Sequence, residues 1–103
     1  MENLDKQNQI QIELGEDVAQ GTYSNLAIIS HSTSEFIIDF IRIVPGIPKA
    51  KVKSRIILTP EHAKRLLFAL KENIDKFENA NGPIRMGGDP GGFLPPIGGI
   101  GQA

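Results

Sequence analysis

The chain has 103 residues, a formal net charge of −1 and no cysteine. This length accommodates one small domain, and the near-neutral charge excludes a globally basic nucleic-acid binder but not a local basic patch. Without cysteine there are no disulfides, thiolate metal sites or cysteine nucleophiles. The polar, acidic N-terminus does not resemble a signal peptide, and no stretch reaches the ~18–20 apolar residues of a membrane span. We therefore expect a cytoplasmic protein.

Four segments have the pattern of β-strands. Residues 9–14 alternate apolar and polar side chains, as a strand with one solvated face does. Further strands are predicted over residues 22–31 and 34–44, with a serine-rich turn between them that favours a hairpin. Two prolines in residues 45–48 end the third strand because they remove ladder donors, and the fourth covers residues 49–58. The first strand could instead pair with a neighbouring subunit.

The third predicted strand is apolar on both faces, which is typical of a central strand or of one covered by another subunit. A helix follows the fourth strand, with Thr59 as N-cap, Pro60 at its first position and Glu61 near its positive dipole end. Its apolar stripe, which has the i, i+3, i+4, i+7 spacing, consists of Ala63, Leu66, Leu67, Leu70, Ile74 and Phe77. We expect this helix to pack across the apolar face of the sheet.

These segments predict a polar lead-in (residues 1–8), one α+β domain (residues 9–79) and a flexible Gly/Pro-rich tail (residues 80–103). The domain would be an antiparallel sheet of about four strands followed by one C-terminal helix. The tail carries spaced apolar residues that could dock onto a partner, or that are incidental in a disordered segment: Phe93, Leu94, Ile97 and Ile100.

The best candidate for a binding site is a row of cations in the fourth predicted strand, formed by Lys49, Lys51, Lys53 and Arg55. Period two would place all four on one sheet face, and the neighbouring strand would add Arg42. Such a row can neutralise phosphates or meet an acidic protein surface. Alternatively, it is a solvated face, or an edge strand that lysines protect from aggregation.

Other candidate residues have weaker support. Phe68 lies outside the apolar stripe of the helix, so it is either a partner or dimer contact or a chance exposed side chain. His31 and His62 lack a second histidine or paired carboxylates at ligand spacing, so we expect no metal, no cofactor and no catalytic residue. Only Tyr23 is available outside the core for base stacking.

Several runs resemble a known family of small bacterial proteins. They are Gly21-Thr22-Tyr23-Ser24-Asn25-Leu26-Ala27-Ile28-Ile29-Ser30-His31-Ser32, Ser34-Glu35-Phe36 with Asp39-Phe40, Pro45-Gly46-Ile47-Pro48-Lys49-Ala50-Lys51-Val52, and Arg55-Ile56-Ile57-Leu58-Thr59-Pro60-Glu61-His62-Ala63-Lys64. The resemblance, over residues 20–79, is to the domain of unknown function 3467, familiar from Bacteroidota-type bacteria. The family has no established catalytic residues. Its members are often encoded beside the large RNA polymerase subunits, which implies a transcription-linked partner.

These observations together predict a non-enzymatic interaction module, a homodimer that acts as an accessory protein of the transcription machinery. The partner-binding residues would be Arg42, Lys49, Lys51, Lys53, Arg55 and Phe68. Two alternatives stay open: a single-stranded nucleic-acid-binding protein, which is an analogy at the level of the fold, and a chaperone-like module that presents apolar surface to unfolded proteins. An enzyme is the least expected class.

Overall fold

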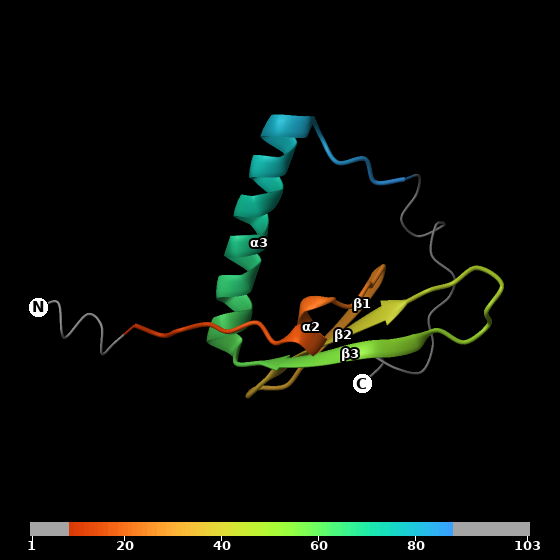
Figure 1. The fold of residues 1–103 in the computed structure, drawn as a ribbon, viewed down its shortest axis with the longest axis horizontal. Coiled ribbons are helices and arrows are strands. Elements are labelled where there is room, and N and C mark those ends of the chain that lie inside the picture. The colour runs from red at the N-terminus through yellow and green to blue at the C-terminus, as the bar shows by residue number, and fades with distance from the viewer. Residues whose placement is uncertain (1–8, 88–103) are drawn as a thin grey trace, which may run out of the picture.

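The computed structural model describes residues 9–87 and consists of a small sheet with one long helix (Figure 1). Its elements are α2 (Glu16–Ala19), β1 (Leu26–His31), β2 (Phe36–Arg42), β3 (Lys51–Leu58) and α3 (Pro60–Asn81). The strands form one antiparallel sheet in the order β1-β2-β3. The predicted class is therefore confirmed: an antiparallel sheet followed by one C-terminal helix, with three strands in the described residues where about four were expected.

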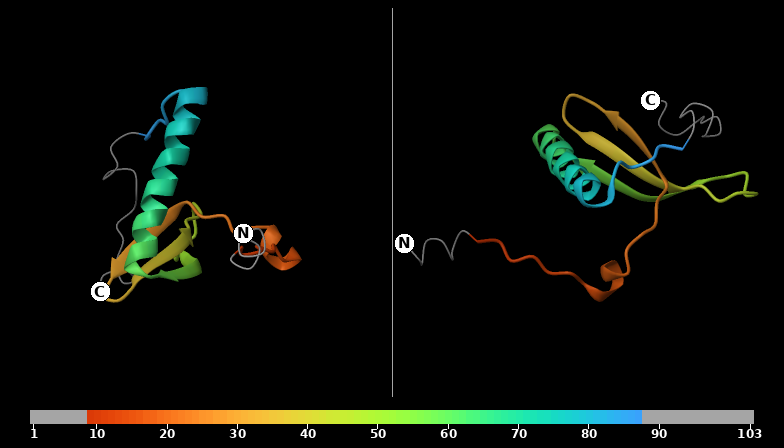
Figure 2. Two further views of the ribbon diagram at one scale, coloured as in Figure 1. Left: turned by 90° about the vertical axis from the view of Figure 1, so that its left-hand side faces the viewer. Right: turned by 90° about the horizontal axis from the view of Figure 1, so that it is seen from above.

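The missing strand is the first one predicted. Residues 9–15 have no regular structure, and Ile10 and Ile12 are 86% and 93% exposed. Figure 2 shows this N-terminal arm running well away from the sheet. Alternating side chains make a strand only where a neighbouring edge supplies backbone partners, and neither edge of the sheet pairs with residues 9–15 in this structure. The prediction of a strand over residues 9–14 is thus wrong for the structure of the single chain.

Both connections between strands contain a tight turn with residues suited to it. In the first, Ser32 donates its N–H to the Glu35 carbonyl over 2.9 Å, and its hydroxyl accepts the Ser34 N–H over 3.1 Å. In the second, the Ile47 N–H reaches the Val44 carbonyl over 3.1 Å, and Gly46 has φ +85°. Pro45 followed by a glycine with positive φ is the sequence of a type II turn.

An ion pair lies in the middle of the sheet. Asp39 on β2 faces Arg55 on β3, and the Arg55 guanidinium donates two hydrogen bonds of 2.6 and 2.9 Å to the Asp39 carboxylate. Asp39 is 3% exposed, whereas the Arg55 side chain is 55% exposed. The hydrogen bond from Arg55 lowers the pKa of Asp39 below its ordinary value and outweighs burial, which acts in the opposite direction. Ile38 and Ile41, beside Asp39, are the buried apolar residues of the described chain.

A single residue, Thr59, joins β3 to α3. Thr59 has extended φ/ψ angles of −68° and 155°, and its hydroxyl accepts the His62 N–H over 3.2 Å, as predicted for an N-cap. Strand-to-helix connections usually take about 2–6 residues when the helix folds back on the sheet. With one residue, α3 rises steeply from the end of β3 instead of lying along the sheet (Figure 1), and its main sheet contact is with that strand. The prediction that the helix packs across the sheet is therefore wrong.

The two partners of the ion pair should not contribute equally to stability. At pH 7 we expect Arg55→Met to lower the free energy of unfolding more than Asp39→Asn, because it leaves a buried carboxylate without its cation. The Asp39→Asn change leaves only a guanidinium that water already reaches. Urea denaturation of both variants at one protein concentration measures the difference, and equal losses would contradict this ranking.

The same pair predicts a specific pH dependence. In the wild type its contribution is present above the unfolded carboxyl pKa of about 3.9 and is lost as pH falls through the lower native pKa. In Arg55→Met burial is left without the opposing hydrogen bond and raises the pKa of Asp39, so the stability deficit of the variant relative to the wild type should shrink as the pH falls toward the unfolded carboxyl pKa of about 3.9. Denaturation curves from pH 7 to pH 3 test this, and a deficit that stays constant would show that the loss is not electrostatic.

The N-cap makes a separate prediction. Thr59→Ala removes the acceptor for the His62 N–H and should cost about 1 kcal/mol of unfolding free energy. Thr59→Ser keeps the hydroxyl and should restore most of that loss. Chemical denaturation at matched protein concentration gives both values, and a loss with serine as large as with alanine would show that the hydroxyl is not the cause.

Candidate interaction surfaces

The predicted row of cations does not occupy one face of the sheet. Arg55 pairs with Asp39, and Lys51 pairs with Arg42. Asp39 and Arg42 are three residues apart on β2, so they point to opposite faces. A register shift between Phe40 and Ile41 leaves Lys53 as an extra residue on β3, which is the arrangement of a β-bulge. The prediction of a common face is wrong, because a bulge breaks the period of two.

The remaining cations gather at one end of the sheet, in what we call the cationic corner: Arg42, Lys49, Lys51 and Lys53, with Tyr23. All are exposed, and none takes part in a salt bridge within residues 9–87. The Arg42 guanidinium carbon lies 5.5 Å from the centre of the Tyr23 ring, a cation–π distance. An open hollow of 430 Å³ lies beside them, lined by Tyr23, Asn25, Arg42, Ile43, Val44 and Pro45.

Hydrogen bonds between the two residues before β1 and the end of β2 fix the walls of the hollow. The Asn25 side chain accepts the Ile43 N–H over 2.8 Å and donates to the Ile43 carbonyl over 3.0 Å. The Ser24 hydroxyl donates to the Ile41 carbonyl over 3.0 Å. These contacts fix the segment that carries Tyr23 against the strand that carries Arg42. Sequence reasoning placed Arg42 beside the lysines but did not join Tyr23 to it, because the pairing depends on register.

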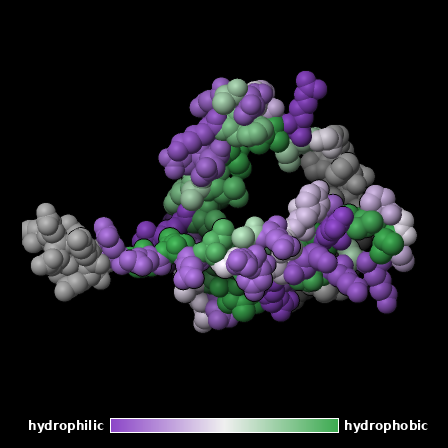
Figure 3. All heavy atoms as spheres, viewed as in Figure 1, coloured by the Kyte–Doolittle hydropathy of each residue, from purple (hydrophilic) through white to green (hydrophobic). Residues whose placement is uncertain are grey.

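A second surface, which we call the α3 apolar surface, runs along the helix and consists of Leu66, Leu67, Leu70, Ile74 and Phe77. These residues are 37–60% exposed, and α3 has no buried residue along its 22 positions. Figure 3 shows hydrophobic side chains on the side of α3 turned toward the sheet, with open space between them. The opposite side is hydrophilic, and the ion pairs Arg65–Glu61 and Lys71–Asp75 lie on the solvated part of the helix.

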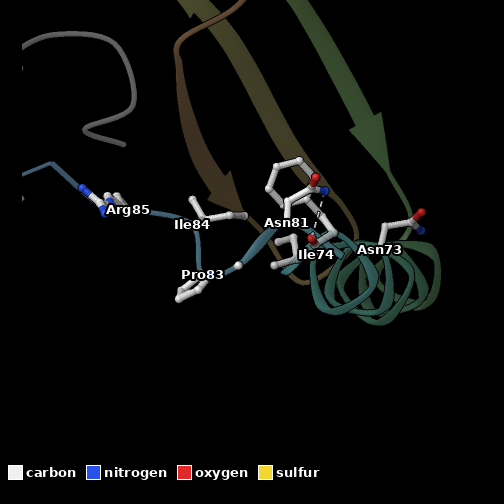
Figure 4. A pocket seen from close by; sticks show the side chains of 8 residues that line it. Asn73, Ile74, Asn81, Pro83, Ile84 and Arg85 are labelled. Atoms are coloured by element: carbon white, nitrogen blue, oxygen red, sulfur yellow. Dashed lines mark hydrogen bonds between the residues drawn. The ribbon is translucent and has the colours of Figure 1, made fainter. Parts of the chain in front are cut away.

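The α3 apolar surface continues past the end of the helix. Gly82 ends α3 with φ +87°, and the Ile84 N–H donates to the Glu78 carboxylate over 2.9 Å. Ile84 thereby lies opposite Ile74 across a hollow of 680 Å³ (Figure 4). Sequence reasoning missed Ile84; the signal was an apolar residue directly after the Gly82-Pro83 stop.

The other predicted candidates have simple structural settings. Phe68 is 59% exposed on α3, which is no more than Leu67 of the apolar stripe at 60%, so its role as a partner contact stays a prediction. The His31 ring stacks on Phe36 with centroids 5.2 Å apart, so it packs against its cross-strand neighbour. His62 lies in the first turn of α3, where its backbone N–H completes the cap. Phe93, Leu94, Ile97 and Ile100 lie outside the described residues.

The described residues give no sign of a metal centre or a membrane span. No group of three or more histidine, cysteine, aspartate or glutamate side chains among them could hold a metal ion. None of the described helices combines the length and apolar character needed to cross a bilayer.

Comparison with known proteins places the chain in a family. No curated protein and no solved structure matches it. A family model with the description "Protein of unknown function (DUF3467)" matches residues 1–86, which include the sheet and α3. The chain belongs to this family, as the resemblance in the sequence indicated.

Proposed function

We propose that this protein is a non-enzymatic protein-interaction module that docks on an acidic surface of its partner through the cationic corner. The observation that carries the proposal is the gathering of Arg42, Lys49, Lys51 and Lys53 at one end of the sheet, away from any carboxylate partner in residues 9–87. Cations left without partners in a chain of net charge −1 form a local positive field that attracts acidic surfaces.

The composition of the corner favours a protein as the partner. Next to the cations are Tyr23, which is 67% exposed, and two apolar residues of the β2–β3 connection, Val44 and Ile47, at 38% and 57%. Arginine and tyrosine are enriched in protein interfaces, where apolar residues form the centre and charges the rim. Because Arg42 already stacks on Tyr23, binding would order fewer side chains.

The transcription machinery is the partner that the family resemblance suggests, and RNA polymerase is its first candidate. The β2–β3 end of the sheet suits docking on a large assembly because it is separate from α3. β3 begins at Lys51 in the corner and ends at Leu58 beside the helix, so about 23 Å of strand lies between them. A partner can therefore occupy the corner while the α3 apolar surface is engaged elsewhere.

Co-purification from the native host tests the proposal. With a tag on the N-terminus, we expect polymerase subunits to be captured at low salt and to survive nuclease treatment. The double variant Arg42→Glu, Lys51→Glu should reduce capture about tenfold or more, because like charges would then face the acidic surface. Lys76→Glu, a single charge reversal at an exposed position on α3, is the control for a reversal outside the corner and should capture normally.

Two results would overturn the proposal. Capture of nucleic acid alone, lost with nuclease and with salt, would favour the single-stranded nucleic-acid alternative, in which the same cations neutralise phosphates. Equal capture by the wild type, the double variant and Lys76→Glu would show that the corner is not the docking surface.

A further inference from the structure

We propose that the α3 apolar surface is covered by a second copy of this chain, which pairs its own α3 with it around a two-fold axis. This proposal does not depend on the cationic corner. It starts from a helix of 22 residues with no buried side chain. Helices in proteins gain most of their stability from packing an apolar face against other elements, so such a helix requires a partner.

The chain cannot supply that partner from its own sheet. Thr59 alone separates the last residue of β3 from the first residue of α3, and Pro60 fixes the backbone at the helix start. A helix that folds back along its sheet needs a longer connection. The α3 apolar surface therefore faces open space (Figure 3). Of the apolar residues of α3, only Ala63 in the first turn is partly covered.

The spacing of the exposed residues identifies another helix as the occupant. Ala63, Leu67, Leu70, Ile74 and Phe77 follow one another at alternating intervals of four and three residues. This is the a/d spacing of a coiled-coil seam, in which side chains of one helix insert between those of a facing helix. The α3 of a second copy has the same seam, and a two-fold contact brings identical surfaces together.

The apolar area of α3 and Ile84 is a large part of what a stable dimer needs. If the roughly 200 Å² of an aromatic side chain is taken as an upper figure for each residue, the exposed fractions of Leu66, Leu67, Leu70, Ile74, Phe77 and Ile84 amount to at most roughly 570 Å² per copy. A standard specific interface buries about 800 Å² per partner. The helix thus provides most of the required area before any sheet residue is counted.

The small core argues for a partner that is always present. Ile38 and Ile41 are the buried apolar residues in the described part of the chain, whereas Leu70 and Phe77 on α3 are more than half exposed. A chain that folds only with another protein would depend on the supply of that protein. A second copy is available whenever the chain itself is made, and a net charge of −1 opposes self-association very little.

Sedimentation equilibrium of the full chain, combined with circular dichroism, tests the proposal. The wild type should be a dimer at micromolar concentration. Leu70→Glu places a charge in the seam and should weaken association at least 100-fold, with loss of helix on dilution. Phe68→Glu is the matched control: Phe68 is equally exposed on the same helix, at 59% against 55%, but lies outside the seam, so this variant should remain dimeric.

Cysteine cross-linking reports on the helix contact directly, so it tests the proposal even if Leu70→Glu fails to fold. The chain has no cysteine, so a single introduced thiol is specific. Leu67→Cys, Leu70→Cys and Ile74→Cys, alone or refolded in pairs, should give disulfide-linked dimers under dilute oxidising conditions. Phe68→Cys should stay unlinked.

The proposal is overturned by a wild type that is a helical monomer at 100 µM, or by cross-linking at Phe68 as readily as at the seam. It is also overturned if α3 captures unfolded proteins while the chain stays monomeric, which is the chaperone-like alternative. These outcomes are distinct from failure of the proposed function: a dimer that captures no acidic partner would reject the docking role of the corner and leave the α3 pairing intact.

Discussion

The one-residue junction at Thr59 determines the shape of this protein. A single extended residue between a strand and a helix leaves little chain in which the helix can fold back along the sheet, so α3 rises steeply from the end of β3 (Figure 1). The N-cap and Pro60 reinforce that geometry because they fix the first turn of the helix. Consequently the main apolar surface of the chain is not its own core but the exposed face of α3 that is turned toward the sheet.

The sheet, left without a helix across it, depends on interactions within its own plane. The Asp39–Arg55 pair crosses from the central strand to β3 beside Ile38 and Ile41. We expect a buried carboxylate of this kind to specify the strand register, because every register that separates it from its cation leaves a buried charge unpaired. The pair lies next to the bulge at Lys53 and fixes the strands on one side of it. Arg55, itself one of the predicted row of cations, thus helps to fix the β2–β3 register that places these cations on two faces of the sheet.

Much of the secondary structure could be predicted from local sequence. Thr59-Pro60-Glu61, the serine-rich turn and Pro45-Gly46 each specify a conformation through their own chemistry, and the structure has the helix start and both turns there. Two features could not be predicted this way: the bulge at Lys53 depends on pairing with another strand, and the N-terminal arm needs an edge that the sheet does not supply. The direction of α3 was predicted wrongly although the sequence already indicated a one-residue junction, because the apolar stripe of the helix was given more weight than the length of that junction.

The candidate surfaces follow the same division. The sequence pattern was enough to identify Arg42, the lysines and the apolar stripe of α3. Which of these residues lie together could be learned only from the structure, because Arg55 pairs with Asp39 and Tyr23 lies against Arg42. A dimer through α3 would carry two cationic corners, each at the far end of its β3. Two sites on one particle raise the effective concentration of the second contact once the first is made. Weak charged contacts, each screened by salt, would then suffice to hold a large acidic partner whose surface spans both corners.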